Sequence, residues 1–100
     1  MLTLEELKDW LRIDFNDDDN ELSSLLSISY ATIEAATGIT KEYVESHQST
    51  TLSELYKMTQ IILITDLYNN ETSENKALTS YYLQLEAEYR KCKKNDEDKE

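Results

Sequence analysis

Few residues in this chain are of types that could do covalent or acid–base chemistry. The sequence holds one histidine, His47, and one cysteine, Cys92. His47 falls in a polar stretch that we expect to form a loop, and Cys92 falls near the end of the last predicted helix. Neither has a neighbouring residue that would complete a nucleophile–base pair. The single glycine, Gly38, excludes a glycine-rich phosphate loop. We therefore predict no catalytic residue and no cofactor site.

One acidic stretch resembles the start of a calcium-binding loop. Its alternating oxygen-bearing residues are Asp14, Asn16, Asp18 and Asn20. Counted from the first of these, an EF-hand loop has glycine at the sixth position and glutamate at the twelfth. Here the sixth position is an aspartate and the twelfth is Leu25, so both defining positions fail. We interpret these acids as residues that favour a helix N-terminus, and we predict no metal site.

The composition of the 100-residue chain favours helices. It includes one glycine and no proline, whereas sandwiches, barrels and hairpins need many tight turns. A chain of this length forms one small domain. We predict an all-α fold in which residues 1–94 form a small four-helix bundle-like domain. Residues 95–100 are all polar, and we predict that they form a disordered acidic C-terminal tail.

Charge is distributed unevenly along the chain. The formal net charge is -11, and residues 1–75 contain fifteen acids and four bases, whereas residues 76–100 contain six of each. A protein this acidic repels nucleic acid and anionic membranes, so we expect no specific binding to either. The longest apolar run, residues 61–64, is far shorter than the roughly 20 residues of a membrane span. With one cysteine and no signal-peptide pattern, we expect a soluble chain that is intracellular when it is made.

Capping patterns mark the starts of the first two predicted helices. Thr3 and Glu6 form a capping-box pattern, which predicts a helix that ends near Leu11. Asp18 and Glu21 repeat this spacing inside the acidic stretch, where carboxylates favour the positive end of the helix dipole. We expect the second helix to begin there.

The rest of the chain contains two more predicted helices. Gly38 is placed to end the second helix, and residues 39–50 are predicted to form a loop that can include one helical turn. A third helix, over residues 52–68, is apolar nearly all round at its middle. Such a helix is enclosed on several sides, so it is either the central element or covered by a neighbouring subunit. A fourth helix is predicted over residues 76–93.

Helical spacing also predicts which side chains form the core. Two facing stripes on the second and third helices supply most of it, and in the connector after the first helix Ile13 and Phe15 are expected to point inward. The predicted stripe residues are Leu22, Leu26, Ile33, Met58, Ile62 and Leu67.

The last predicted helix combines tyrosines with a basic cluster. The chain has seven tyrosines against one phenylalanine and one tryptophan. Tyrosine is favoured where one end of a side chain is buried and the other meets water, as at interfaces. Core packing within the monomer and a solvated helix end explain part of this pattern, and contact with another subunit or an acidic partner explains the rest. The candidate interface residues, for contact with another subunit or with a partner protein, are Tyr81, Tyr82, Tyr89, Arg90, Lys91, Lys93 and Lys94.

Several motifs taken together resemble one family. The first half has a Leu-Arg-Ile-Asp exit at residues 11–14, an acidic start of the second helix, and a Thr-Gly stop at residues 37–38. The second half has an apolar helix that closes in a tyrosine and a polar pair over residues 62–70, and a final helix with the pattern of residues 83–90. The pattern over residues 2–90 resembles the tailed-phage head–tail connector proteins, the small helical adaptors that dock beneath the portal.

The resemblance implies a structural part and not an enzyme. On this resemblance we expect a homo-oligomeric ring on the twelve-fold axis of the portal, which closes the head after DNA packaging and presents a surface to the next head-completion or tail protein. The resemblance also implies a location in the host cytoplasm during assembly and at the head–tail junction of the virion afterwards. The thin core and the surplus tyrosines agree with a surface that needs a neighbour.

The acidic excess has more than one explanation. If packaged DNA passes through a ring, a wall of carboxylates would let the duplex slide; the candidate DNA-facing acids are Asp17, Asp18, Asp19 and Glu21. The same acids would also simply keep a small protein soluble. An acidic protein–protein interaction module and a DNA-mimic inhibitor are the alternative functions, although the acids do not show the spacing of phosphates along DNA.

Overall fold

The structure is a computed structural model, which describes residues 2–47, 49–69 and 75–98, with side chains described up to residue 95. Within these ranges the chain forms five α-helices and no strand, so the predicted all-α class is confirmed. The helices are α1 (Leu4–Leu11), α2 (Asp19–Thr37), α3 (Lys41–Ser46), α4 (Thr50–Tyr68) and α5 (Lys76–Asp98).

The start of α1 and the end of α2 follow the sequence patterns. The Thr3 hydroxyl accepts from the Glu6 amide at 3.1 Å, and the Glu6 carboxylate accepts from the Thr3 amide at 3.2 Å, which completes the capping box. Gly38 has φ 79°, and its N–H donates to the Glu34 carbonyl at 2.7 Å. That left-handed conformation favours glycine, so the helix stops where the sequence predicts.

The predicted side-chain cap at the start of α2 is wrong. Asp18 occupies the N-cap position, but its side chain makes no capping hydrogen bond. Instead its carboxylate accepts from the Tyr68 hydroxyl at 2.5 Å, across 50 residues of sequence. A long-range partner therefore takes the oxygen that a local pattern assigned to the helix terminus.

Two smaller differences concern the predicted loop and the last helix. The possible helical turn after Gly38 is a separate helix, α3, which begins where the Thr40 hydroxyl accepts from the Tyr43 amide at 3.1 Å. The last helix does not end at Lys93 but continues to Asp98, and so includes residues 95–98 of the predicted tail. No glycine or proline is present there to stop it. Residues 99–100 of that tail lie outside the described residues.

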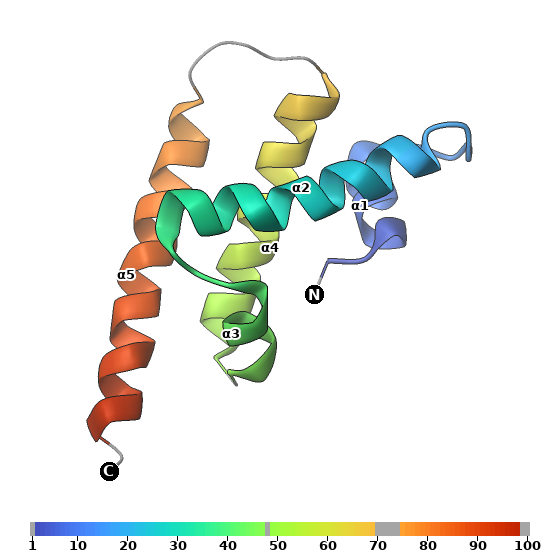
Figure 1. Cartoon of the computed structure of the whole chain (residues 1–100). Helices are drawn as coiled ribbons and strands as arrows, with labels where there is room; N and C mark the ends of the chain where they lie inside the picture. Colours follow the sequence, from blue (N-terminus) through green and yellow to red (C-terminus); the bar gives the residue numbers. More distant parts are fainter. Residues whose placement is uncertain (1, 48, 70–74, 99–100) are drawn as a thin grey trace.

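Helix α4 is the central element, as its all-round apolar middle predicts. It contacts each of the other helices. Figure 1 shows α4 and α5 running antiparallel beside each other, with α2 crossing over them and α1 near the start of α2. Helix α3 lies against the beginning of α4. None of the helices in the described ranges is both long and apolar enough to span a bilayer.

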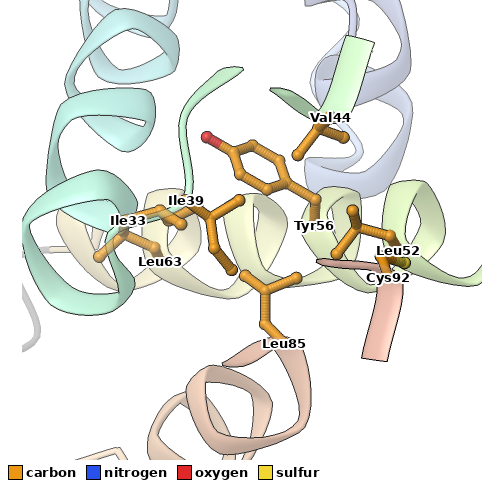
Figure 2. Packing of buried hydrophobic residues seen from close by; sticks show 8 residues of the cluster. All are labelled: Ile33, Ile39, Val44, Leu52, Tyr56, Leu63, Leu85 and Cys92. Carbon is orange, nitrogen blue, oxygen red and sulfur yellow. The ribbon is translucent and has the colours of Figure 1, made fainter. Parts of the chain in front are cut away.

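The core consists of two clusters of buried side chains. The aliphatic cluster joins the N-terminal segment, α1, the start of α2 and the second half of α4; it contains Leu2, Leu7, Ile13, Leu22, Ile61 and Ile64. The aromatic cluster joins the end of α2, α3, α4 and α5, and half-buried tyrosines pack around it. It contains Ile33, Ile39, Val44, Leu52, Tyr56, Leu63, Leu85 and Cys92 (Figure 2).

The predicted core is right in part. Leu22 and Ile33 are fully buried, and Ile13 is buried as expected. Two predictions are wrong, because Leu67 is 40% exposed and Phe15 is 51% exposed.

The physical reason for the Leu67 error lies in α4. Its buried side includes Thr59 and Gln60, two polar residues that an apolar stripe leaves out. The buried face of α4 is therefore rotated about the helix axis relative to the stripe that apolar spacing predicts. Leu26, Met58 and Ile62, the remaining predicted residues, are half-buried.

Candidate assembly surfaces

Part of the predicted interface on α5 is used inside the monomer. The Tyr89 ring meets the Tyr43 ring edge-on, with centroids 4.8 Å apart and an angle of 85° between the planes. The Lys93 Nζ lies over both rings, 5.3 Å from the Tyr89 centroid and 5.9 Å from the Tyr43 centroid. Such cation–π contacts stabilise an exposed site by about 0.5–1 kcal/mol. Tyr89 and Lys93 therefore attach α3 to α5.

The other candidates on α5 differ in how far they reach into solvent. Tyr82 is half-buried against the aromatic cluster, and this burial raises the pKa of its hydroxyl. Tyr81 is also half-buried. Arg90, Lys91 and Lys94 are exposed. The basic residues, more than the tyrosines, are thus the part of the predicted interface that faces outward.

The acidic stretch before and within the start of α2 is divided in the same way. The Lys8 Nζ lies 2.8 Å from Asp19 Oδ1 and also donates to Asn16 at 2.8 Å. Asp18 accepts from Tyr68, and this hydrogen bond to the carboxylate raises the pKa of the tyrosine hydroxyl. The remaining two of the four candidate acids, Asp17 and Glu21, are exposed. Only half of the predicted acidic surface is therefore free of an internal role.

The structure holds the acidic and basic candidates apart within one chain. The start of α2 and the C-terminal end of α5 lie at opposite ends of the molecule in Figure 1, and the long axis of the chain extends over 50 Å. The two groups of charges cannot neutralise each other inside one copy. Chemically, this arrangement can attract a second molecule with the complementary charge.

Three exposed apolar side chains are additional surface features. Trp10, Ile28 and Leu83 are among the exposed large hydrophobic residues. The sequence patterns predict no surface role for any of them. The signal that could have found Ile28 and Leu83 is their position: each lies off the buried stripe of its own helix. An isolated exposed apolar residue is ordinary, so only its surroundings give it meaning.

Cys92 and His47, the candidates for covalent or acid–base chemistry, both pack against other side chains of the chain. Cys92 is buried in the aromatic cluster, and the His47 ring stacks on Tyr43 with centroids 5.2 Å apart. Among the described residues, no three histidine, cysteine, aspartate or glutamate side chains gather closely enough to hold a metal ion.

These features describe a small all-helical protein with oppositely charged exposed surfaces at its two ends. The family model described as Phage gp6-like head-tail connector protein matches residues 1–91, so the chain belongs to this family. No curated protein and no solved structure matches the chain. Membership confirms the resemblance read from the sequence and makes the chain a structural adaptor of the phage head–tail junction.

Proposed function

We propose that this chain forms a homo-oligomeric ring that docks on the portal after DNA packaging and presents its other surface to the next head-completion or tail protein. The observation that carries this proposal is the family match, which covers α1 to α4 and most of α5. The connector role therefore rests on the whole fold and not on a short motif. A ring on the portal would follow the twelve-fold axis expected from the family resemblance.

The charges of the surface support assembly from identical copies. Exposed acids at the start of α2 and exposed cations at the end of α5 are unlike surfaces of one chain. Contact between unlike surfaces is heterologous, and it produces a closed ring when the rotation from copy to copy closes. Self-complementary surfaces would instead favour a two-fold dimer.

The experiment is reconstitution with the portal protein of the same phage. The chain is mixed with purified portal rings, and the product is imaged by electron microscopy and class-averaged for symmetry. We expect an added ring of density on the portal, with portal rings alone and the chain alone as controls. Portal rings that stay bare at saturating concentrations of the chain would contradict the proposal.

The DNA-facing role of the acids stays a prediction. Because Asp18 and Asp19 have internal partners, this role depends mainly on Asp17 and Glu21. In the reconstituted connector, such acids would be reachable from the channel. A water-soluble carbodiimide and a small amine would then modify them as readily as in the free chain, whereas protection on ring formation would place them at a protein contact.

A further inference from the structure

The outward face of α5 differs in composition from the rest of this acidic chain. Leu83 is 62% exposed and lies at the centre of a row of exposed residues at helical spacing. We call this row the α5 ridge; it contains Lys76, Ser80, Leu83, Ala87, Arg90 and Lys94. The ridge thus has an apolar centre with small neighbours, and three cations without an acid.

The outward face of α2 has a similar layout with the opposite charge. Ile28 is 48% exposed and is flanked by small side chains at helical spacing. We call this row the α2 ridge; it contains Glu21, Ser24, Ile28, Ala31 and Ala35. Its acidic end is the N-terminal one, where the exposed Asp17 precedes the helix.

The charges on the two ridges differ from the charges that stabilise the monomer. Lys8 and Lys57 form ion pairs with acids of the same chain, at 2.8 Å and 3.3 Å. In the described part of the chain, Glu21, Arg90 and Lys94 take part in no such pair. The ridge charges are therefore available to a second molecule.

We propose that the α2 ridge of one copy packs antiparallel against the α5 ridge of the next copy, with Ile28 against Leu83 and Glu21 beside Arg90. This inference rests on the proposed ring and identifies its subunit contact, and it assigns Glu21 to that protein contact in place of a DNA-facing role. Glu21 precedes Ile28 by seven residues and Arg90 follows Leu83 by seven. Seven residues of helix span about 10.5 Å, so the antiparallel arrangement that joins the apolar residues also joins the unlike charges.

Several physical features favour this orientation. Small side chains beside Ile28 and Leu83 let two helices approach to about 8–10 Å between their axes. In the antiparallel orientation the cations that follow Leu83 face the acidic start of α2. The acids there are Glu21 in the helix and Asp17 in the preceding loop. The reverse orientation joins Glu21 to Lys76 alone and places Arg90 beside Ala35, so it matches fewer unlike charges.

The occupant of the α5 ridge is a second copy and not a distant part of the same chain. Both helices bury their opposite faces in one shared core, so their outward ridges cannot meet within a monomer. A copy with a net charge of -11 repels another copy over most of its surface. The α5 ridge, by contrast, carries three cations and therefore attracts the acidic surface of another copy.

The test adds one reporter cysteine to each of two variants in the connector reconstituted on the portal. One batch of chain carries Ile28→Cys and a second carries Leu83→Cys, and a short bismaleimide is added to the mixture. We expect a cross-linked dimer from the mixture and none from either variant alone, because the contact is heterologous. Cys92 is buried and common to all samples, so the single-variant reactions control for it. Circular dichroism confirms that each variant is helical.

The matched control replaces Ile28→Cys with Leu67→Cys, which also changes an exposed aliphatic residue to cysteine but lies off both ridges. Equal cross-linking of the Leu67→Cys and Leu83→Cys mixture would overturn the proposal. So would cross-linking of Leu83→Cys with itself, because a two-fold contact would then be present. A wild-type ring on the portal without the expected cross-link disproves this contact while the proposed function stands. A portal that stays bare with wild-type chain disproves the function itself.

Charge exchange tests the orientation. We expect Glu21→Arg alone and Arg90→Glu alone each to weaken ring assembly about tenfold or more, because each places like charges in contact. The double variant Glu21→Arg with Arg90→Glu should restore assembly. Restoration by Lys76→Glu in place of Arg90→Glu would show a parallel contact and overturn the proposal.

Discussion

The two core clusters share helices α2 and α4, and each attaches different neighbours to them by different means. The aliphatic cluster has only leucine and isoleucine at its centre, and its rim carries the ion pairs Lys8–Asp19 and Lys57–Glu6. The aromatic cluster is built around a buried tyrosine, Tyr56 (Figure 2). Four half-buried tyrosines pack against this cluster. Three of the four bases in residues 1–75 thus form ion pairs within the chain, whereas the C-terminal helix keeps most of its cations exposed.

This difference explains why the charge asymmetry of the sequence is informative about assembly. A cation that forms an internal pair loses much of its attraction for a partner molecule. Lys8 and Lys57 are two of the four bases in residues 1–75, and both are paired. Arg90, Lys91 and Lys94 remain exposed on α5, so the basic surface comes from residues 76–100, the quarter of the chain whose formal net charge is zero.

The strongest test of the comparison removes one buried side chain from each cluster. Leu22→Ala in the aliphatic cluster and Leu85→Ala in the aromatic cluster each leave a cavity at a fully buried position. We expect each to lower the free energy of unfolding by about 2–5 kcal/mol, enough to unfold much of so small a domain. Chemical denaturation followed by circular dichroism measures the effect.

The matched control is Leu67→Ala, at the exposed leucine of α4. A change at the surface should alter the free energy of unfolding by only about 0.5 kcal/mol. A loss at Leu67 as large as the loss at Leu22 would contradict the cluster assignment. Two separate unfolding transitions in either core variant would show that the clusters are independent units.

The next test concerns the rim of the aliphatic cluster. The Lys8 side chain is only 14% exposed and binds both Asp19 and Asn16. Lys8→Met keeps the aliphatic stem but removes both contacts, so we expect a loss of about 1–2 kcal/mol, partly screened by salt. Lys91→Met is the control, because Lys91 is an exposed lysine of α5. A change at such a surface position should alter the free energy of unfolding by only about 0.5 kcal/mol. Similar losses at both sites would contradict a special role for Lys8.

The sequence predicts those parts of the fold that depend on neighbours along the chain. Thr3 with Glu6 and the Gly38 stop are local devices, and both form as expected. Asp18 fails because its partner, Tyr68, is 50 residues away, and no local pattern encodes that contact. Phe15 fails because a connector has no periodicity to indicate which side chain points inward.

The same limit applies to the surfaces. The basic cluster at the end of α5 is visible in the sequence, but the internal role of Tyr89 and Lys93 depends on α3, which was expected as a loop. Ile28 and Leu83 become informative only when the buried face of each helix is known. Composition therefore indicates that the chain has an interaction surface, and the packing of the helices determines which residues belong to that surface.

A third test exchanges tyrosine for phenylalanine in both clusters. The Tyr56 hydroxyl is buried and makes no hydrogen bond to the described residues, and this burial raises its pKa. Tyr56→Phe removes a desolvated polar group, so we expect the free energy of unfolding to stay constant or to rise by up to about 1 kcal/mol. Tyr68→Phe loses the bond to Asp18 and should lower the melting temperature. A melting temperature lowered by Tyr56→Phe and unchanged by Tyr68→Phe would reverse this assignment.

The smallest effect is a pH dependence that belongs to the aliphatic cluster. The hydrogen bond from Lys57, followed by the one from the Thr3 amide, holds the pKa of Glu6 below its ordinary value of 4.5. Because the folded state binds this proton less readily, the stabilisation is complete above pH 4.5 and is lost as the pH falls through the folded pKa. The side chain is 44% exposed, so solvent limits the contribution to about 0.5 kcal/mol or less. In Glu6→Gln, the difference in stability from wild type should therefore be present at pH 7 and shrink on acidification.

Glu5→Gln, at the exposed neighbouring position, is the matched control, and its stability should follow the wild-type curve. A constant difference between Glu6→Gln and wild type from pH 7 to pH 3 would show that the Lys57 contact does not couple α1 to α4 through charge.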